Sequence, residues 1–299
     1  MSEIAHPDKR WLRRRFDRAA PTYEAAAALA HEVAGRMAER LELLRAVPSR
    51  VLDAGSGTGH GARLLRRRYP GSVVVEADFS LGMLARSARR AGWWRRGLSR
   101  MTGAWEPRVC ADVERLPFAD ASFDMVWSNL ALQWLGAQQD ALAELYRVLR
   151  PGGVCLFSTL GPDTLKELRA AYAQADSYVH VHRFIDLHDY GDMLVHARFA
   201  DPVMDMEYFA LTYPDVQALL RELKAASAGN ADPGRRPGLT AKVAVARMEA
   251  AYSAYRRDGR VPATFEVIYG HAWRPETSRT AADGRAVVAF HHRPARGLR

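Results

Sequence analysis

The hydrophobic positions of the chain follow a helical period near its beginning and change after residue 50. Within residues 8–46, apolar and aromatic side chains recur at helical spacing, and Pro21 interrupts the pattern. Between residues 50 and 160, short apolar runs alternate with helix-like stretches. This alternation predicts a mostly parallel sheet that is covered by helices on both faces.

The second half of the chain continues with longer helical stretches and two further strands. Helices are expected over residues 163–175 and within 184–199, and a sixth strand over 202–209. A helical block follows at 213–259, and residues 263–273 alternate like a last strand.

A glycine-rich turn follows the first apolar run. Residues 51–59 read VLDAGSGTG, so that Gly55, Gly57 and Gly59 alternate with small residues. Glycine lets the backbone turn tightly and approach a bound ligand closely, and a strand, such a turn and a helix open a nucleotide-binding unit. The G-x-G-x-G spacing is not that of a dinucleotide fingerprint, and no Lys-Ser/Thr of a phosphate-binding loop follows. Asp53 beside the turn would repel a pyrophosphate but suits a cationic ligand.

A second apolar run ends in acids about 20 residues after the glycines, as expected for a ribose-binding position. Residues 73–78 read VVVEAD, and a carboxylate there can accept hydrogen bonds from both ribose hydroxyls of an adenosine. We assign this role to Asp78 rather than Glu76, because residues 78–84 continue as DFSLGML.

Five motifs in this order resemble those of class I S-adenosylmethionine (SAM)-dependent methyltransferases. They are VLDAGSGTG at 51–59, DFSLGML at 78–84, DVERLPF at 112–118, SFDMVWSN at 122–129 and LRPGG at 149–153. The resemblance implies that Asp112 contacts the adenine amine and that Val113 packs on the ring. The expected cofactor-binding residues are Asp53, Gly55, Ser56, Gly57, Gly59, Asp78, Phe79, Met83, Asp112, Val113 and Asn129.

The resemblance implies an α/β fold with a Rossmann-like sheet of seven strands, preceded by N-terminal helices. The last two strands of this fold normally form a close pair, but here about 50 residues separate them, too many for a plain loop. We therefore expect a helical lid inserted before the last strand. The expected parts are an N-terminal helical segment at 1–48, a SAM-binding core at 49–211, the lid at 212–260, the last strand at 261–275 and a tail at 276–299.

Composition narrows the class of protein. Hydrophobic residues make up 48% and charged residues 26% of the 299 residues, as in soluble globular proteins. We expect no membrane association, because no apolar run approaches the roughly 18 residues of a membrane span. Cys110 and Cys155 fall on or beside expected core strands, which suggests buried thiols and a cytoplasmic protein. The net charge of +9 favours an acidic partner.

Further segments are unlike those of generic methyltransferases. They are FDRAAPTY at 16–23, SNLALQW at 128–134, FSTLGPDTLKEL at 157–168, DPVMDME at 201–207 and YGHAW at 269–273. Together they resemble the malonyl-carrier-protein O-methyltransferases of biotin synthesis over about residues 8–275. The resemblance implies methylation of the free carboxylate of a malonyl thioester on acyl carrier protein, an acidic partner. The Trp- and Arg-rich insertion at 92–105 departs from the family pattern, as does the sequence SAGN at 227–230.

Three residues are candidates for the reaction itself. The resemblance places Tyr23 over the cofactor, and Trp134 follows the fourth strand near the expected point of methyl transfer. Arg183 is the first choice for the substrate carboxylate, because arginine offers a bidentate fork. Helix packing, a core aromatic and an exposed surface arginine are the respective alternatives. An anionic substrate needs no general base.

Other chemistries are less consistent with the sequence. His180, His182 and His188 do not have the spacing of metal ligands, so no metal site is expected. The motifs after the fourth strand that mark amino methylation of bases or carbon methylation of cytosine are absent from the sequence. The remaining alternatives are an arginine hydroxylase like a complex I assembly factor, an RNA methyltransferase that uses the basic insertion, and a catalytically silent SAM-binding scaffold. No nucleic-acid partner is expected.

Overall fold

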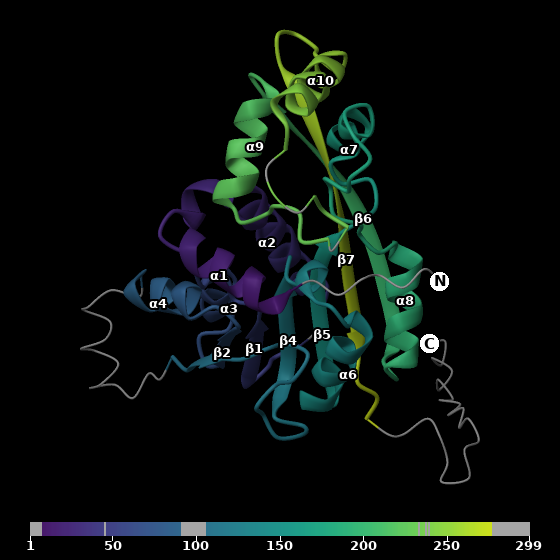
Figure 1. The fold of residues 1–299 in the computed structure, drawn as a ribbon. Helices are drawn as coiled ribbons and strands as arrows, with labels where there is room; N and C mark the ends of the chain where they lie inside the picture. The colour runs from purple at the N-terminus through teal and green to yellow at the C-terminus, as the bar shows by residue number, and fades with distance from the viewer. Residues whose placement is uncertain are drawn as a thin grey trace.

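The computed structural model describes residues 8–44, 46–90, 106–232, 234–236, 238 and 240–276. The Trp- and Arg-rich insertion at 92–105 lies outside the described residues, as do the residues of the tail from 277 onward. The described chain forms one large sheet with helices on both of its faces (Figure 1).

Seven strands form the sheet in the order β3-β2-β1-β4-β5-β7-β6. They are β1 (Arg50–Ala54), β2 (Val73–Asp78), β3 (Arg108–Cys110), β4 (Phe123–Asn129), β5 (Leu149–Leu160), β6 (Ala200–Tyr213) and β7 (Val261–Trp273). The first five strands are parallel, and β7 is antiparallel to both β5 and β6. The predicted seven-stranded class I methyltransferase sheet is therefore confirmed. Its order reverses beside β1, where the carboxyl ends of the strands offer a ligand-binding crevice.

The helices cover the two faces of this sheet and its far end. They are α1 (Lys9–Ala19), α2 (Ala28–Arg40), α3 (His60–Arg68), α4 (Leu81–Arg90), α6 (Gln138–Val148), α7 (Lys166–Ala173), α8 (Leu187–His196), α9 (Val216–Ala225) and α10 (Lys242–Ser253). None of the helices in the described part of the chain is long and apolar enough to cross a membrane.

Alternation along the parallel strands divides the core into two layers. Val51 and Val74 belong to a buried cluster with residues of α2 and α3. Their neighbours Leu52 and Val75 point to the opposite face and pack in a cluster with residues of α6 and α8. Successive side chains of a strand point to opposite faces, so the continuous apolar runs of the sequence become two cores.

The predicted helical insertion lies between β6 and β7, where α9 and α10 follow one another. With α7 they pack on the ends of β6 and β7 that extend beyond the other strands (Figure 1). Leu219, Met248 and Phe265 are buried in this third cluster. Strand β6 is longer than the predicted range of 202–209. Most of its side chains are at least partly exposed, as in an edge strand, so the hydrophobic pattern in the sequence did not mark its full length.

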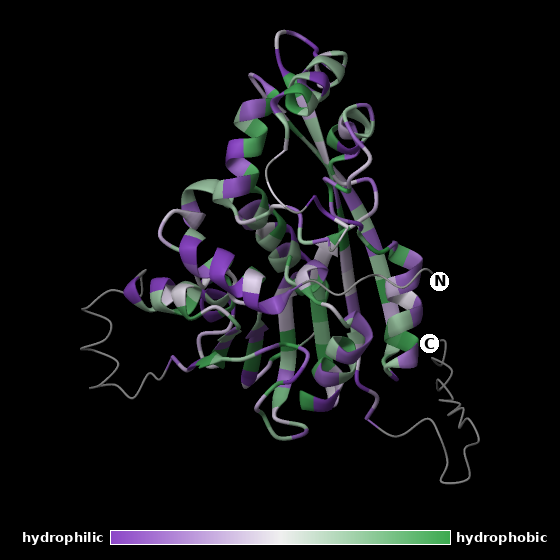
Figure 2. Ribbon diagram, in the orientation of Figure 1, coloured by the Kyte–Doolittle hydropathy of each residue, from purple (hydrophilic) through white to green (hydrophobic). Residues whose placement is uncertain are grey.

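Helix α1 is strongly hydrophilic, and six of its 11 residues are Lys or Arg (Figure 2). Its apolar side chains Leu12 and Phe16 are buried against Met83 and Ala231. The helix therefore covers the carboxyl edge of the sheet from one side.

The two cysteines differ from the expectation. Both are free thiols, and Cys155 in the central strand β5 is buried as predicted. Cys110 is exposed, so the prediction was wrong there. The reason is its place at the end of β3, a short strand at the edge of the sheet.

Candidate functional site

The glycine turn between β1 and α3 brings the backbone close to the end of β2. Gly55, Gly57 and Gly59 have φ angles of 78°, 54° and 78°, which favour glycine. A Cβ on Gly55 would lie 2.4 Å from the Cβ of Ala131. The Gly57 N–H donates to Asp78 Oδ2 at 2.8 Å. Because a Cβ on Gly57 would meet no atom within 4 Å, the turn leaves open space beside this N–H.

Asp78 is held in a fixed orientation at the end of β2. Its second oxygen, Oδ1, accepts a hydrogen bond from the Ser80 N–H at 2.8 Å. Burial raises the pKa of Asp78 to about 6, so the carboxylate remains charged at pH 7. Each carboxylate oxygen has two lone pairs, so Asp78 can accept further hydrogen bonds from a ligand.

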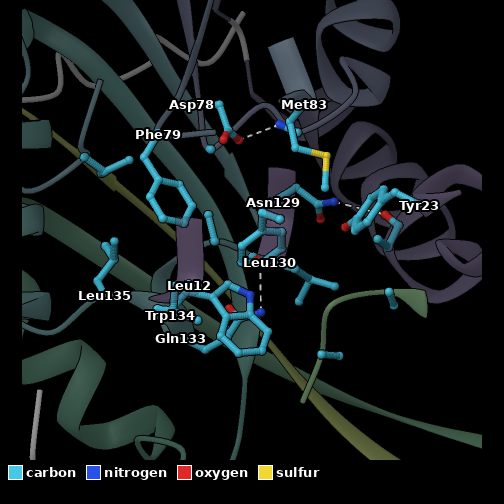
Figure 3. Close-up of a pocket in the computed structure, with 18 of the residues that line it drawn as sticks. Leu12, Tyr23, Asp78, Phe79, Met83, Asn129, Leu130, Gln133, Trp134 and Leu135 are labelled. Atoms are coloured by element: carbon cyan, nitrogen blue, oxygen red, sulfur yellow. Dashed lines mark hydrogen bonds between the residues drawn. The ribbon is translucent and has the colours of Figure 1, made fainter. Parts of the chain in front are cut away.

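A pocket opens beside Asp78 at the carboxyl ends of the strands. Figure 3 shows Asp78, Phe79 and Met83 at one end of it, Trp134 with Gln133 at the other, and Asn129 between them. The lining residues come from α1, the glycine turn, the ends of β2 and β4, and the segment after α9. This contribution from segments far apart in sequence makes the pocket partly enclosed.

Most of the residues predicted from the sequence meet in this pocket. Its lining contains Tyr23, Gly55, Gly57, Asp78, Phe79, Met83, Asp112, Val113, Asn129 and Trp134. Aromatic rings form part of the wall, and Phe16 makes edge-to-face contacts with Phe79 and Trp134 at centroid distances of 5.7 Å each.

Asp53 does not line the pocket, contrary to the expectation that it faces a cationic ligand. Its carboxylate lies at the start of α3, where it accepts a backbone hydrogen bond from Ala62 and would lie 3.0 Å from a Cβ on Gly61. The free N–H groups of a helix N-terminus attract such a group. Burial, reinforced by nearby Glu76, raises the pKa of Asp53 to about 8. The Asp53 carboxyl group therefore stabilises the turn from the side of α3, away from the pocket.

Two further residues of the turn, and Glu76, also lie outside the pocket lining. A Cβ on Gly59 would lie 2.2 Å from Ser87 Oγ of α4, so Gly59 allows close packing of the turn on that helix. The Ser56 side chain is buried without a hydrogen-bond partner among the described residues. Glu76 is fully buried and pairs with Arg66 at 2.9 Å, so that of the two acids of β2 it is Asp78 that reaches the pocket.

Arg183 is the predicted residue that the structure separates most clearly from the site. Its side chain is exposed, and it lines neither the pocket beside Asp78 nor the neighbouring chamber. Its neighbours His182 and Phe184 face that chamber instead. The structure therefore does not support the expectation that Arg183 binds the substrate carboxylate.

Lys9 is a pocket residue that sequence reasoning missed. Its Nζ lies 2.5 Å from Asp112 Oδ2 and 2.5 Å from Glu114 Oε2. Lys9 thereby fixes the start of α1 over the loop that carries Asp112. No local sequence signal marks this pair, because 103 residues separate its members.

A second chamber adjoins the pocket. The two cavities share Trp134, Leu160 and Ala228 as lining residues. The chamber extends under the helical insertion, whose residues Leu220 and Leu223 line it. The pocket therefore adjoins a second space whose lining is largely apolar.

His182 lies in the wall of this chamber. Its ring is tilted against Trp134 at 6.1 Å and packs edge-on against Phe184 at 5.3 Å. Burial lowers the pKa of His182, so the imidazole is neutral at pH 7. The described residues contain no group of three or more His, Cys, Asp or Glu side chains that could hold a metal ion.

Comparisons with known proteins identify the family. A model of the Methyltransferase domain family matches residues 52–157. The malonyl-acyl carrier protein O-methyltransferase of Laribacter hongkongensis is 54% identical over 99% of this chain and 100% of its own length. The protein of the same name from Gallionella capsiferriformans is 52% identical over 94% of this chain and 96% of its own. The chain belongs to the malonyl-acyl carrier protein O-methyltransferase family.

Solved structures share the fold of this methyltransferase at low sequence identity. The [4+2]-cyclase SpnF superimposes with a TM-score of 0.58 at 21% identity, over 92% of this chain and 100% of that one. The YcgJ protein of Bacillus subtilis gives a TM-score of 0.54 at 17% identity, over 83% and 100% of the two chains. These similarities support the class I methyltransferase fold alone.

The Methyltransferase domain match covers less of the chain than the match to the Laribacter relative, and this difference separates general methyltransferase features from those of the narrower family. The Methyltransferase domain match ends within β5 and contains the glycine turn, Asp78 and Trp134. Helix α1, Tyr23 and the helical insertion lie outside it, but within the span shared with the Laribacter relative. Relatives named methyltransferases at 52–54% identity also favour methyl transfer over the hydroxylase and RNA methyltransferase alternatives.

Proposed function

We propose that this methyltransferase transfers the methyl group of SAM to the free carboxylate of malonyl-acyl carrier protein, an early step of biotin synthesis. The observation that carries the proposal is the junction of two cavities. An Asp78 carboxylate anchored on the glycine turn faces one of them, and Trp134 stands at the border with the other. The first fits an adenosyl cofactor and the second an acyl substrate.

The cofactor is held by the residues around the turn. Asp78 accepts hydrogen bonds from the ribose hydroxyls, Asp112 and Val113 receive the adenine, and Phe79 and Met83 pack against the adenosine. Gly55, Gly57 and Asn129 complete the wall. The Asn129 amide is itself oriented by hydrogen bonds, since Nδ2 donates to Ala30 O at 3.0 Å and Oδ1 accepts from Ser158 at 2.8 Å.

The reaction depends more on the orientation of the substrate carboxylate toward the methyl group than on acid–base catalysis. SAM supplies a methyl group on a positively charged sulfur. A carboxylate oxygen of the substrate forms a bond to the methyl carbon while the carbon–sulfur bond breaks, and the sulfur keeps the electron pair. No proton moves, so the site needs an enclosed, correctly oriented approach.

The ionisable residues of the cofactor pocket agree with a reaction that has no general base. In the described part of the chain, those that line it are Lys9, Tyr23, Asp78 and Asp112. Burial raises the pKa of Tyr23 to about 12, so its phenol is neutral at pH 7. Tyr23 therefore closes the pocket beside Asp78 without accepting a proton, and Trp134 separates the cofactor side from the substrate side.

The proposed partner is an acyl carrier protein in the cytoplasm. Its acidity complements the net charge of +9 of this chain. No nucleic-acid partner is proposed.

A direct assay tests the proposed function. The protein is incubated with methyl-labelled SAM and malonyl-acyl carrier protein, and acetyl-acyl carrier protein serves as the control without a free carboxylate. We expect a mass gain of about 14 on the malonyl carrier and a base-labile label, as for addition of CH₂ to form an ester. A label on the acetyl carrier, or no transfer to the malonyl carrier by folded protein that binds SAM, would contradict the proposal.

A further inference from the structure

The second chamber contains a cation without an acidic partner. Arg15 of α1 lines this chamber beside aliphatic side chains such as Leu168 and Leu223. Among the described residues, none that lines the chamber is Asp or Glu. Within the described part of the chain, no carboxylate forms an ion pair with Arg15, and burial together with nearby Arg235 lowers its pKa. A partly buried charge of this kind favours the binding of an anion.

A second guanidinium lies close to the first. The Cζ atom of Arg15 lies 4.5 Å from the ring centroid of Trp11, and that of Arg235 lies 4.2 Å from the same centroid. The ring faces attract cations, but the two like charges repel each other. An anion beside Arg15 would relieve this repulsion and replace the missing carboxylate.

The loop after α9 holds the Arg15 head group against the chamber wall. A Cβ on Gly229 would lie 2.3 Å from Nη2 and 2.8 Å from Nη1 of Arg15, so the guanidinium lies directly on the Gly229 backbone. Asn230 fastens this loop, because its Nδ2 donates to Val179 O at 2.6 Å and its Oδ1 accepts from the Asp232 N–H at 2.9 Å. The guanidinium is therefore confined rather than free in solvent.

The other basic residues of the chamber fit an anion less well. Lys224 lines the chamber but is exposed. His180 is paired with Asp176 at 2.7 Å and stacks on Tyr172. His182 is neutral at pH 7, as described above. Arg15 is thus the charged donor that is both partly buried and without a described acidic partner.

We infer that Arg15 binds the free carboxylate of the malonyl group and presents it to the cofactor, with Arg235 as a supporting cation. The inference rests on the proposed function and gives Arg15 the role that the sequence had suggested for Arg183. Arg15 precedes Phe16, whose ring contacts Trp134 at the border of the two cavities. Helix α1 therefore borders both cavities, since Phe16 lines the cofactor pocket and Arg15 lines the chamber.

The chemistry of the reaction gives this arrangement a consequence for selectivity. A guanidinium fork can bind both carboxylate oxygens and still leave each a free lone pair for attack on the methyl group. Esterification removes the negative charge, so the product loses its ion pair with Arg15. Arg15 thus favours binding of the substrate over that of both the methyl ester and an acyl group without a carboxylate.

Substrate discrimination by matched variants tests the inference. Affinities for malonyl- and acetyl-acyl carrier protein are measured by calorimetry with S-adenosylhomocysteine present, together with KM and kcat for malonyl-acyl carrier protein. We expect the wild type to prefer the malonyl carrier and Arg15→Gln to lose most of this preference. The KM of Arg15→Gln for malonyl-acyl carrier protein should rise about 10- to 100-fold, as expected from the free energy of a lost charge-assisted hydrogen bond. Its kcat should change less.

Three controls separate this role from general charge and from folding. Arg14→Gln removes an exposed charge from the same helix and should keep the malonyl preference. Gly229→Ala keeps every charge but displaces the guanidinium, so it should weaken the preference. Arg15→Lys should recover part of it. Unchanged binding of S-adenosylhomocysteine by Arg15→Gln would show that the cofactor pocket is intact.

Three outcomes would overturn the inference, and they are distinguishable. If the wild type methylates malonyl-acyl carrier protein and Arg15→Gln keeps its preference and KM, Arg15 does not bind the carboxylate, while the proposed function stands. Equal loss of preference in Arg14→Gln and Arg15→Gln would also reject a specific role. If the wild type does not methylate malonyl-acyl carrier protein, the proposed function fails and this inference fails with it.

Discussion

Asp53 and Asp78 are both buried acids beside the glycine turn, but their surroundings give them different tasks. The Asp78 carboxylate accepts two backbone N–H groups and faces the pocket. Asp53 is 1% exposed and lies against the start of α3. Burial and the nearby charge of Glu76 raise the pKa of Asp53 to about 8, whereas burial raises that of Asp78 only to about 6 because two backbone hydrogen bonds oppose it. At pH 7 Asp78 is therefore charged and Asp53 is mostly neutral.

A pair of amide variants should separate these roles. Asp78→Asn should weaken SAM binding about 10- to 100-fold, because a charged acceptor of the ribose hydroxyls is lost. Asp53→Asn should change it little at pH 7, since the side chain remains neutral. In the wild type, SAM affinity should fall as the pH drops through about 6 and Asp78 is protonated. Calorimetric titration between pH 5 and 8 measures both effects.

Two results for Asp78→Asn would contradict the role assigned to Asp78. An unchanged affinity, or the same loss of affinity below pH 6 in Asp78→Asn as in the wild type, would show that another group binds the ribose.

The role of a single residue could be assigned from the sequence where the residue belongs to a local motif whose backbone geometry is known. Asp78 follows such a motif, and the structure places it in the pocket. Asp53 also belongs to a motif, but its rotation behind the turn depends on the N-terminus of α3. Lys9 and Arg15 carry no motif, because their positions depend on contacts with Asp112 and Gly229, which are distant in the chain.

Among the elements, α1 has an unusual combination of a basic sequence and a functional position. Leu12 and Phe16 line the cofactor pocket, whereas Arg15 lines the adjoining chamber. Its first turn is capped by Asp8, whose side chain accepts hydrogen bonds from the N–H groups of Arg10 and Trp11 at 2.9 and 3.1 Å. The cap stabilises a helix whose own sequence buries few residues.

Removal of this cap should loosen the cover of the pocket. Asp8→Ala should destabilise α1 by about 1 kcal/mol, accelerate exchange of its amide hydrogens and weaken SAM binding severalfold. Asp8→Ser can still cap the helix and should remain close to the wild type. Hydrogen exchange with mass-spectrometric detection measures the helix, and calorimetry measures SAM binding. Equal behaviour of the Ala and Ser variants would show that the cap does not matter.

The sequence predicted the elements best where a periodic pattern was long or where a turn motif stood between two elements. The parallel strands of the core are examples, and Pro21 marks the break between α1 and α2. The predicted helix at 163–175 is shorter in the structure, where α7 spans Lys166–Ala173. Its beginning depends on Leu165, whose φ of 55° and hydrogen bond to Thr264 O depend on the distant strand β7.

At the scale of the whole molecule, the methyltransferase combines a standard sheet with a helical insertion and a positive charge. The insertion helps to enclose the second chamber through residues of α9 and the loop that follows it. The net charge of +9 acts over longer distances than any of these contacts. Long-range attraction of this kind mainly affects the rate of association and is screened by salt.

Salt should therefore affect the two substrates differently. The KM for malonyl-acyl carrier protein should rise severalfold as ionic strength increases from about 0.05 to 0.5 M, because a Debye length falls from over 10 Å to a few Å. The KM for SAM should change much less, since its contacts are enclosed. Steady-state kinetics at fixed pH measures both constants. A KM for the carrier protein that is independent of salt would contradict charge-driven association.

The sequence by itself determined the class I sheet, the order of its elements, the insertion before the last strand and the family. Local patterns encode these features, because strand alternation, helical period and glycine turns depend on neighbouring residues. The tertiary structure alone decided that Asp53 lies behind the turn, that Arg183 is exposed, and that Lys9 and Arg15 reach the cavities. Asp53 is placed by the start of α3, whereas Lys9 and Arg15 are placed by contacts with Asp112 and Gly229, which lie about 100 or more residues away. No local pattern records such contacts.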